Sequence, residues 1–172
     1  MRQVSYLFLV ILLTACAVTP VSLGPVSGGM LLPGSGERID YVDVHVEDDI
    51  TSLLVATSWR LDEQHVVFMD PLGKVIAEAS WYGEQWRFTG FAEKQLPMHA
   101  IINLISWTRG ASTEVEHQVE ALGGTYRASG SSRTIRFDRP EQLISIQYDD
   151  EQLVTVRAAI GTTHTVLTIR RL

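Results

Sequence analysis

The sequence predicts a mainly β domain in which an antiparallel sheet is accompanied by one or two helices. From Arg38 onward, apolar side chains recur at every second residue in short runs about ten residues apart, which is typical of an antiparallel sheet or barrel. One segment, residues 96–107, breaks this period and has the composition of a helix. The chain has 172 residues, of which 45% are hydrophobic, and this is enough for a single domain with its own core.

The first fifteen residues have the organisation of a secretory signal. A positive charge precedes an apolar run, residues 4–13, and small residues then lead to Cys16, the one cysteine of the chain. The run is shorter than the ~20 residues that a membrane-spanning helix needs. Leu13-Thr14-Ala15-Cys16 resembles the bacterial lipobox, whose cysteine is acylated and becomes the mature N-terminus. We therefore expect residues 1–15 to be a lipoprotein signal peptide, the alternative being an ordinary cleaved signal that precedes a cysteine.

The segment that follows the signal predicts a membrane tether. The residue after Cys16 is Ala17 rather than an aspartate, and by the same resemblance this predicts sorting to the outer membrane, facing the periplasm. Residues 16–36 are rich in glycine and proline and poor in charge, so we expect a flexible segment after the lipidated cysteine. The folded domain is then residues 37–172, held at the outer membrane through the Cys16 lipid.

Nine period-two runs predict the strands of this domain. They are residues 42–46, 53–60, 66–69, 75–82, 86–91, 134–137, 143–148, 153–160 and 165–170. Residues 96–107 predict a helix with Pro97 in its first turn. Its apolar residues extend beyond one narrow stripe, so we expect it to be buried on most sides against a curved sheet. Residues 114–122 fit either a second helix or a strand.

The turn Asp70-Pro71-Leu72-Gly73 places an apolar side chain at a hairpin tip. Asp, Pro and Gly at its first, second and fourth positions are typical of a type I turn, whereas a polar residue is expected at the third. A strand leading into a Pro-Leu-Gly tip resembles the LolB family of outer-membrane lipoprotein receptors. The chain is also similar to a family of small Gram-negative lipoproteins often encoded beside aryl-polyene and other fatty-acid-like biosynthesis genes. In that family such a hairpin is followed by a Leu/Ile-rich helix ending near a tryptophan, which residues 101–107 match here.

The resemblance implies both a fold and a function. The fold would be a curved antiparallel half-barrel of the LolA/LolB type with a helical lid or plug. Pro71, Leu72 and Gly73 would form a membrane-inserting turn. An apolar cavity would bind or accept acylated cargo, either a lipoprotein or a lipid-like molecule, for localisation or insertion in the outer membrane. A periplasmic LolA-like carrier would be a further partner.

Large apolar residues on several strands and on the predicted helix could line such a cavity. The strands supply Trp59, Trp81, Trp86, Phe88 and Tyr148, and the helix supplies Met98, Ile101, Ile105 and Trp107. The alternative for each of them is an ordinary place in the core. Leu72 likewise has an ordinary interpretation, because single exposed leucines are common on protein surfaces.

Charge and motif content narrow the remaining function classes. A formal net charge of −6 argues against a nucleic-acid partner. The sequence has no Gly-x-Ser-x-Gly motif and no Gly-rich phosphate loop after a strand, so we expect neither catalysis nor a cofactor. Glu114, His117 and Glu120 have helical spacing but lack a further ligand, so no metal is expected. The favoured function is an acyl carrier or acceptor, ahead of an assembly lipoprotein that docks on an envelope complex and of an enzyme acting on envelope lipid.

Overall fold

The computed structural model describes residues 32, 34–46, 48–60, 63–82, 85–90, 98–138, 141–150, 152–160 and 163–172. This part of the chain forms ten strands and two helices. The strands are β1 (Ser35–Val46), β2 (Asp49–Arg60), β3 (Glu63–Met69), β4 (Val75–Tyr82), β5 (Gln85–Gly90), β6 (Gly124–Ser129), β7 (Ser132–Asp138), β8 (Glu141–Tyr148), β9 (Leu153–Ile160) and β10 (Thr163–Arg171), and the helices are α2 (Met98–Arg109) and α3 (Ser112–Ala121). The predicted signal peptide, residues 1–15, and Cys16 lie outside the described residues.

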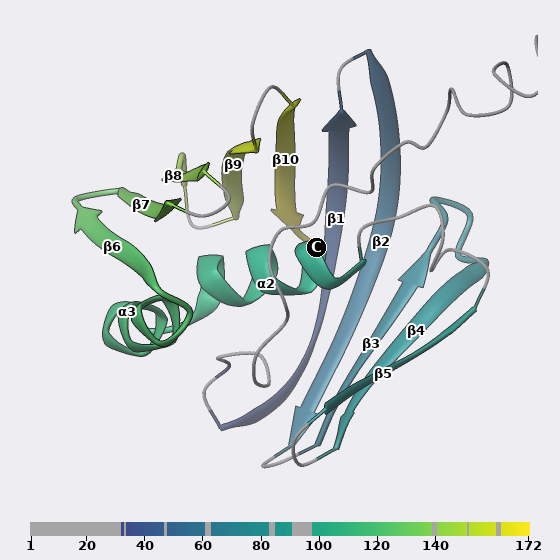
Figure 1. Ribbon diagram of the computed structural model, residues 1–172. Helices are drawn as coiled ribbons and strands as arrows, with labels where there is room; N and C mark the ends of the chain where they lie inside the picture. The colour runs from purple at the N-terminus through teal and green to yellow at the C-terminus, as the bar shows by residue number, and fades with distance from the viewer. Residues whose placement is uncertain are drawn as a thin grey trace, which may run out of the picture.

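All ten strands belong to one antiparallel sheet with the order β5-β4-β3-β2-β1-β10-β9-β8-β7-β6. The sheet curls around one side of the molecule, and its edges, β5 and β6, do not pair with each other (Figure 1). The result is an open half-barrel with helices on its concave side. The predicted fold class, a mainly β curved antiparallel sheet with one or two helices, is therefore confirmed.

The sheet begins two residues before the predicted start of the domain at residue 37. Ser35 and Gly36 pair with Arg60 and Trp59 of β2, so the ladder between β1 and β2 extends to the first residue of β1. The first strand therefore includes the last two residues of the predicted tether, residues 16–36.

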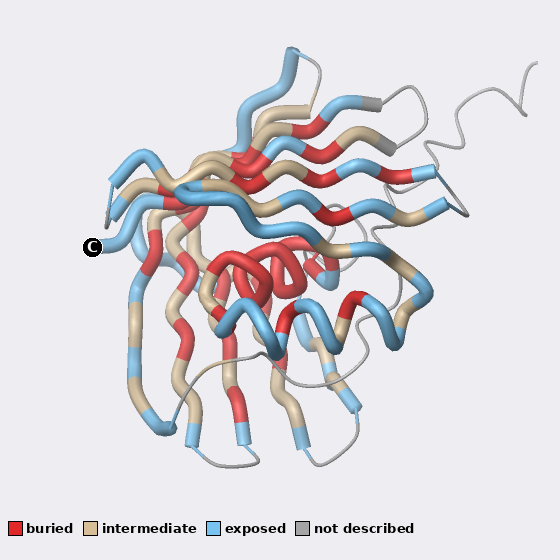
Figure 2. The backbone as a smooth tube through the Cα atoms, turned by 90° about the vertical axis from the view of Figure 1, so that its left-hand side faces the viewer, coloured by how far each residue is buried: buried red, intermediate tan, exposed pale blue. Residues whose placement is uncertain are grey.

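Side chains alternate between the two faces along the strands, and the buried ones form the concave face. In β2, Leu53, Val55 and Thr57 are buried, whereas the residues between them are partly exposed. Figure 2 shows this alternation as red segments separated by tan and blue ones along neighbouring strands. The period of two in the sequence thus identifies the inward side of each strand.

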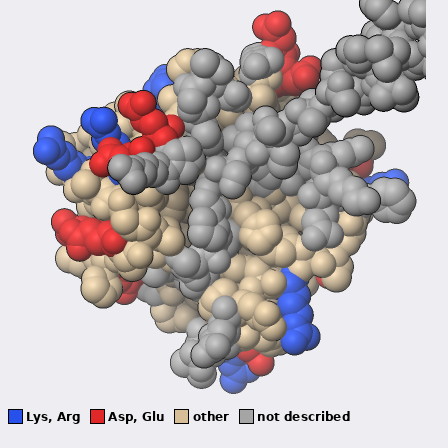
Figure 3. Space-filling view, in the orientation of Figure 1, with Lys and Arg blue, Asp and Glu red and all other residues tan. Residues whose placement is uncertain are grey.

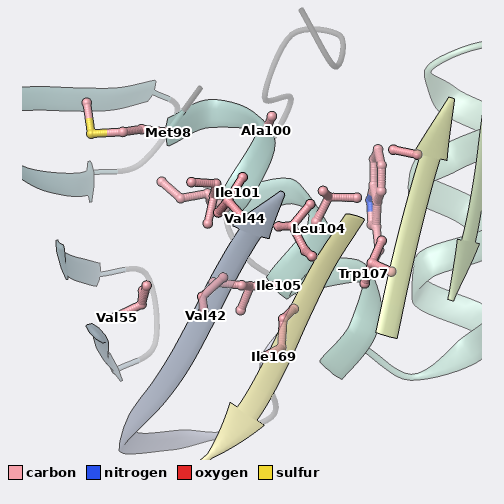
Figure 4. Packing of buried hydrophobic residues seen from close by; sticks show 14 of the residues in the cluster. Val42, Val44, Val55, Met98, Ala100, Ile101, Leu104, Ile105, Trp107 and Ile169 are labelled. Carbon is pink, nitrogen blue, oxygen red and sulfur yellow. The ribbon is translucent and has the colours of Figure 1, made fainter. Parts of the chain in front are cut away.

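Helix α2 lies in the concave side of the sheet and fills it (Figures 1 and 2). Ten of its 12 residues are buried, so the predicted burial on most sides is confirmed. Figure 4 shows Ile101 and Ile105 of α2 close to Val44 and Val42 of β1. Pro97 lies outside the described residues. No helix in the described part of the chain has the length and apolar character needed to cross a bilayer.

The segment after α2 contains one element that the sequence left undecided and one that it did not predict. Residues 114–122 belong mostly to α3, so the helix is the correct one of the two alternatives. Val115 and Val119, four residues apart, are its buried residues. The unpredicted element is β6, an edge strand whose side chains are mostly exposed. Because such a strand needs few inward apolar residues, its sequence lacks the alternation that identifies the others.

Candidate functional site

The turn between β3 and β4 holds Leu72 in solvent on a hydrogen-bonded hairpin tip. The backbone N–H of Gly73 donates to the carbonyl oxygen of Asp70 over 2.9 Å, as the predicted turn requires. The Oδ1 atom of Asp70 accepts from the backbone N–H groups of Leu72 and Lys74, each at 2.9 Å. Gly73 has φ 84°, the left-handed conformation that closes a three-residue hairpin loop. The Leu72 side chain, at the centre of this turn, is 94% exposed.

Four of the predicted aromatic residues lie next to one another on the concave side and are called the aromatic row below. They are Trp59, Trp81, Trp86 and Phe88, each half-buried. Trp59 pairs with Gln64 of β3, Gln64 pairs with Trp81, and Trp81 pairs with Trp86, so this line crosses four neighbouring strands. The ring centroids of Trp81 and Trp86 are 5.6 Å apart, and those of Trp86 and Phe88 are 6.2 Å apart. The structure therefore brings together four of the five strand residues that the sequence assigned to a cavity, and all four remain partly exposed.

The aromatic row and the Leu72 tip lie at opposite ends of the same strands. Gln64 is near the start of β3 and the tip follows its end, which separates them by roughly 20 Å at the usual rise of a strand. Gly36 pairs with Trp59, so β1 starts at the end that carries the aromatic row. In Figure 1, β1 starts at the lower end of the sheet and the β3–β4 connection lies at upper right. The predicted tether thus joins the domain far from Leu72.

Trp59 owes its position to a glycine on the neighbouring strand. A Cβ atom added to Gly36 would lie 2.8 Å from Cζ2 of Trp59, closer than any normal contact. An open cleft of about 350 Å³ lies beside this ring, at the edge of the size range of small-molecule sites. It is lined by Trp59 and by Arg60, His65 and Tyr82, which point to the convex side.

The charged side chains of the face seen in Figure 3 lie mainly around its periphery.

A second open cleft, of about 320 Å³, lies over β4 and the end of β5. Lys74, Glu78 and Gly90 are among the residues that line it, and none of the predicted cavity residues is. Among the described residues, Trp59 is the one member of the predicted set that borders either cleft.

The four helix residues of the predicted cavity are packed in the core. Met98, Ile101, Ile105 and Trp107 are each at most 2% exposed. The indole Nε1 of Trp107 donates to Oε1 of Gln118 over 2.8 Å, which ties α2 to α3. In this structure these side chains contact the sheet, in accord with the core interpretation, and a ligand-filled cavity beside them stays a prediction. Tyr148 is half-buried near the C-terminal end of α2.

A charged cluster lies beneath the C-terminal end of α2. Asp40 of β1 is fully buried, and its Oδ1 is 2.7 Å from Nε of Arg38 and 3.1 Å from a terminal guanidinium nitrogen of Arg109. Burial lowers the pKa of Arg109, and the attraction of Asp40 opposes this effect. One carboxylate thus faces two guanidinium groups.

Several polar atoms of this cluster lack a partner. Oδ2 of Asp40, Nη2 of Arg38, Nε of Arg109 and Oγ1 of Thr57 are buried and make no hydrogen bond in the described part of the chain. Thr57 pairs with Arg38 across β2 and β1, which places its hydroxyl on the same inward surface. An unsatisfied buried polar group costs ~1–3 kcal/mol, so this is an incomplete polar site inside an otherwise apolar interior.

Two further side chains hold the end of α2 against the other half of the sheet. A terminal nitrogen of Arg133 on β7 donates to the carbonyl oxygens of Trp107 and Gly110, at 2.6 and 2.9 Å. The Tyr148 hydroxyl on β8 donates to the carbonyl oxygen of Thr108 over 2.8 Å. Burial raises the pKa of Tyr148, which keeps this donor protonated beyond its ordinary range. These bonds satisfy carbonyl groups that a helix end would otherwise leave open.

Comparison of the sequence with protein-family models and with curated proteins finds no match. The assignment of function therefore depends on the geometry above and on the sequence motifs.

The cluster of Arg38, Asp40 and Arg109 is the feature that sequence reasoning missed. A usable signal was present, because Arg38 and Asp40 occupy the same alternate positions of β1 as Val42 and Val44, which predicts that they face inward. Arg109 offered no such signal. Within the described residues no group of three His, Cys, Asp or Glu side chains is placed to hold a metal ion.

Proposed function

We propose that this chain is a lipoprotein, anchored to the outer membrane through Cys16, that accepts acylated cargo and places it in the membrane. The observation that carries the proposal is Leu72, an apolar side chain held 94% exposed on a hydrogen-bonded tip at one end of an open half-barrel. A flexible loop could fold such a side chain back onto the protein. This turn is constrained by Asp70 and Gly73, so the exposure of Leu72 persists.

The tip is suited to a shallow insertion into a bilayer. Burial of one leucine side chain is worth roughly 1.5–3 kcal/mol, which orients a domain that is already tethered but does not anchor it alone. The aromatic row supports the second part of the proposal. Half-buried indole and phenyl rings offer a largely apolar surface, which suits acyl chains that vary in shape.

The tether is long enough for both ends of the domain to meet one membrane. From Cys16 to Leu32 the chain can span roughly 50 Å when extended. This exceeds the roughly 20 Å between the aromatic row and the tip. The domain can therefore turn its Leu72 end toward the bilayer that holds its own lipid.

The test is the transfer of a fluorescent acylated peptide from the full chain to vesicles of phosphatidylethanolamine and phosphatidylglycerol. We expect Leu72→Glu to slow transfer about tenfold or more, because a carboxylate at the tip removes the apolar contact. The matched control is Leu172→Glu, which alters a leucine that is 68% exposed just after the end of β10, and it should transfer at the wild-type rate. Equal rates for the two variants would overturn the membrane-inserting role of the tip.

A second function, an assembly lipoprotein that docks on an envelope complex, is favoured by one observation. Helix α2 fills the concave side with buried side chains, as a packed scaffold without a ligand would. The two functions differ in what co-purifies with the chain. Native mass spectrometry of protein isolated from a Gram-negative envelope should show a bound acylated mass under the first proposal. A ligand-free mass, together with failure to take up added fatty acid, would favour the scaffold.

A further inference from the structure

The incomplete charged cluster beneath α2 adjoins the aromatic row. On β1 the inward positions are Gly36, then Arg38, then Asp40, and Gly36 is the residue against which Trp59 lies. Residues that face the same side of a strand are about 7 Å apart, so the backbone of Arg38 lies about 7 Å from Gly36 and thus close to the aromatic row. A molecule lying along the aromatic rings would therefore meet the guanidinium group of Arg38 at its inner end.

The charge of the cluster is positive. Among the described residues, three guanidinium groups and one carboxylate lie at the inward positions of β1 and β10 or at the end of α2. The guanidinium groups belong to Arg38, Arg109 and Arg171, and the carboxylate is that of Asp40. Arg171 pairs directly with Asp40 across β10 and β1 and is exposed. The excess positive charge at this point contrasts with the acidic chain as a whole.

The unpartnered atoms show which kind of group is missing. Nη2 of Arg38 and Nε of Arg109 can only donate a hydrogen bond, and Oγ1 of Thr57 can donate or accept one. Three of the four unpartnered atoms can thus be satisfied by an acceptor. An oxygen with negative charge is the strongest acceptor for guanidinium groups, which match carboxylate and phosphate geometry.

We propose that Arg38 and Arg109 bind the anionic head group, a carboxylate or a phosphate, of an acylated molecule whose chain lies along the aromatic row. This inference rests on the proposed function and adds the chemistry of the cargo's polar end. The side chains of Arg38 and Arg109 are 16% and 12% exposed, whereas Nη2 of Arg38 and Nε of Arg109 are buried. A head group would therefore have to displace neighbouring side chains to bind these two atoms.

Quenching of tryptophan fluorescence by dibromostearate measures such binding, because bromine quenches indole rings at contact. All proteins are the full chain carrying Cys16→Ser, so that no lipid attached at that cysteine can compete for the site. Palmitate, hexadecyl phosphate and hexadecanol then compete with the brominated ligand. We expect one or both of the anionic competitors to bind at least about tenfold more tightly than hexadecanol, and their relative strengths distinguish carboxylate from phosphate.

The variant Arg38→Gln should lose about tenfold in affinity for the preferred anion and keep its affinity for hexadecanol. Arg170→Gln removes a guanidinium from the outward face of β10, beside Arg171, and should change neither affinity. Equal binding of the acids and the alcohol by the unaltered site would overturn the head-group inference and leave acyl binding intact. Absence of quenching by any ligand would overturn the proposed acyl binding itself. The comparison of ligands does not use Arg38→Gln, so it remains decisive if that variant fails to fold.

Discussion

Replacement of Asp40 by alanine tests the charged cluster most directly. The change removes the carboxylate that lies 2.7 Å from Arg38 and 3.1 Å from Arg109, and it leaves two largely buried cations without a counter-charge. Removal of one partner from a buried ion pair typically costs ~3–5 kcal/mol. Because the two arginine side chains are 16% and 12% exposed and can be partly hydrated, we expect the lower end, about 3 kcal/mol.

The assay is urea unfolding followed by circular dichroism. With a denaturant slope of ~2 kcal/mol per molar urea, a loss of about 3 kcal/mol lowers the midpoint by roughly 1.5 M. Asp43→Ala is the matched control, since Asp43 lies on the outward face of the same strand and accepts one hydrogen bond, from Oγ of Ser52 at 2.6 Å. That variant should lose only ~0.5–1.5 kcal/mol. If the two variants unfold at the same urea concentration, Asp40 does not neutralise buried charge and the reasoning about the cluster fails.

Three further predictions concern the aromatic row, the end of α2 and the tether. Gly36→Ala should displace the Trp59 ring, at a cost of roughly 1–3 kcal/mol for overpacking, and weaken dibromostearate binding. Gly34→Ala adds backbone strain because Gly34 has φ 65°, but its added Cβ meets no atom within 4 Å, so it should leave Trp59 unmoved. Tyr148→Phe should lower the free energy of unfolding by ~0.5–1.5 kcal/mol at neutral pH, because it removes the hydrogen bond to Thr108. Burial raises the pKa of Tyr148, so the hydrogen bond contributes fully below about pH 10 and is lost as the pH rises through the raised pKa. The urea midpoints of the two proteins should therefore converge in strong alkali. Deletion of residues 17–28 leaves a reach of roughly 14 Å between Cys16 and Leu32, which is less than the length of β3. This deletion should slow vesicle transfer as Leu72→Glu does. Replacement of the deleted residues by a Gly/Ser segment of equal length should restore the transfer rate.

Most of the sheet could be predicted because its residues obey one simple physical rule. In a strand with one face on the core, burial must alternate; it does so along the whole of β3 and over residues 52–58 of β2 and 141–147 of β8. The same rule failed for β6, in which Gly124 and Tyr126 are partly buried and the other side chains are exposed. Helix α2 was recognisable because burial on nearly all sides demands apolar residues around its whole circumference.

The candidate site was only partly accessible from the sequence. The Asp70–Gly73 turn could be predicted because each of its residues meets a local backbone requirement. Alternation also placed Trp59, Trp81 and Trp86 on inward positions, but only the register of four strands shows that they form one row. The contact of Arg109 with Asp40 joins residues 69 positions apart. Such a contact depends on how a helix is seated in the half-barrel, and no local pattern contains that information.

The packing of α2 determines which surface an acyl chain can use. Met98, Ile101 and Ile105 are at most 2% exposed, so the centre of the concave side is filled by the protein's own side chains. An acyl chain gains about 0.8 kcal/mol for each methylene that it buries, and it needs apolar side chains that still reach solvent. The aromatic row and Leu72 both meet this requirement. Because the two lie at opposite ends of the sheet, the proposed function separates binding of cargo from insertion, and the domain must turn on its tether between the two steps.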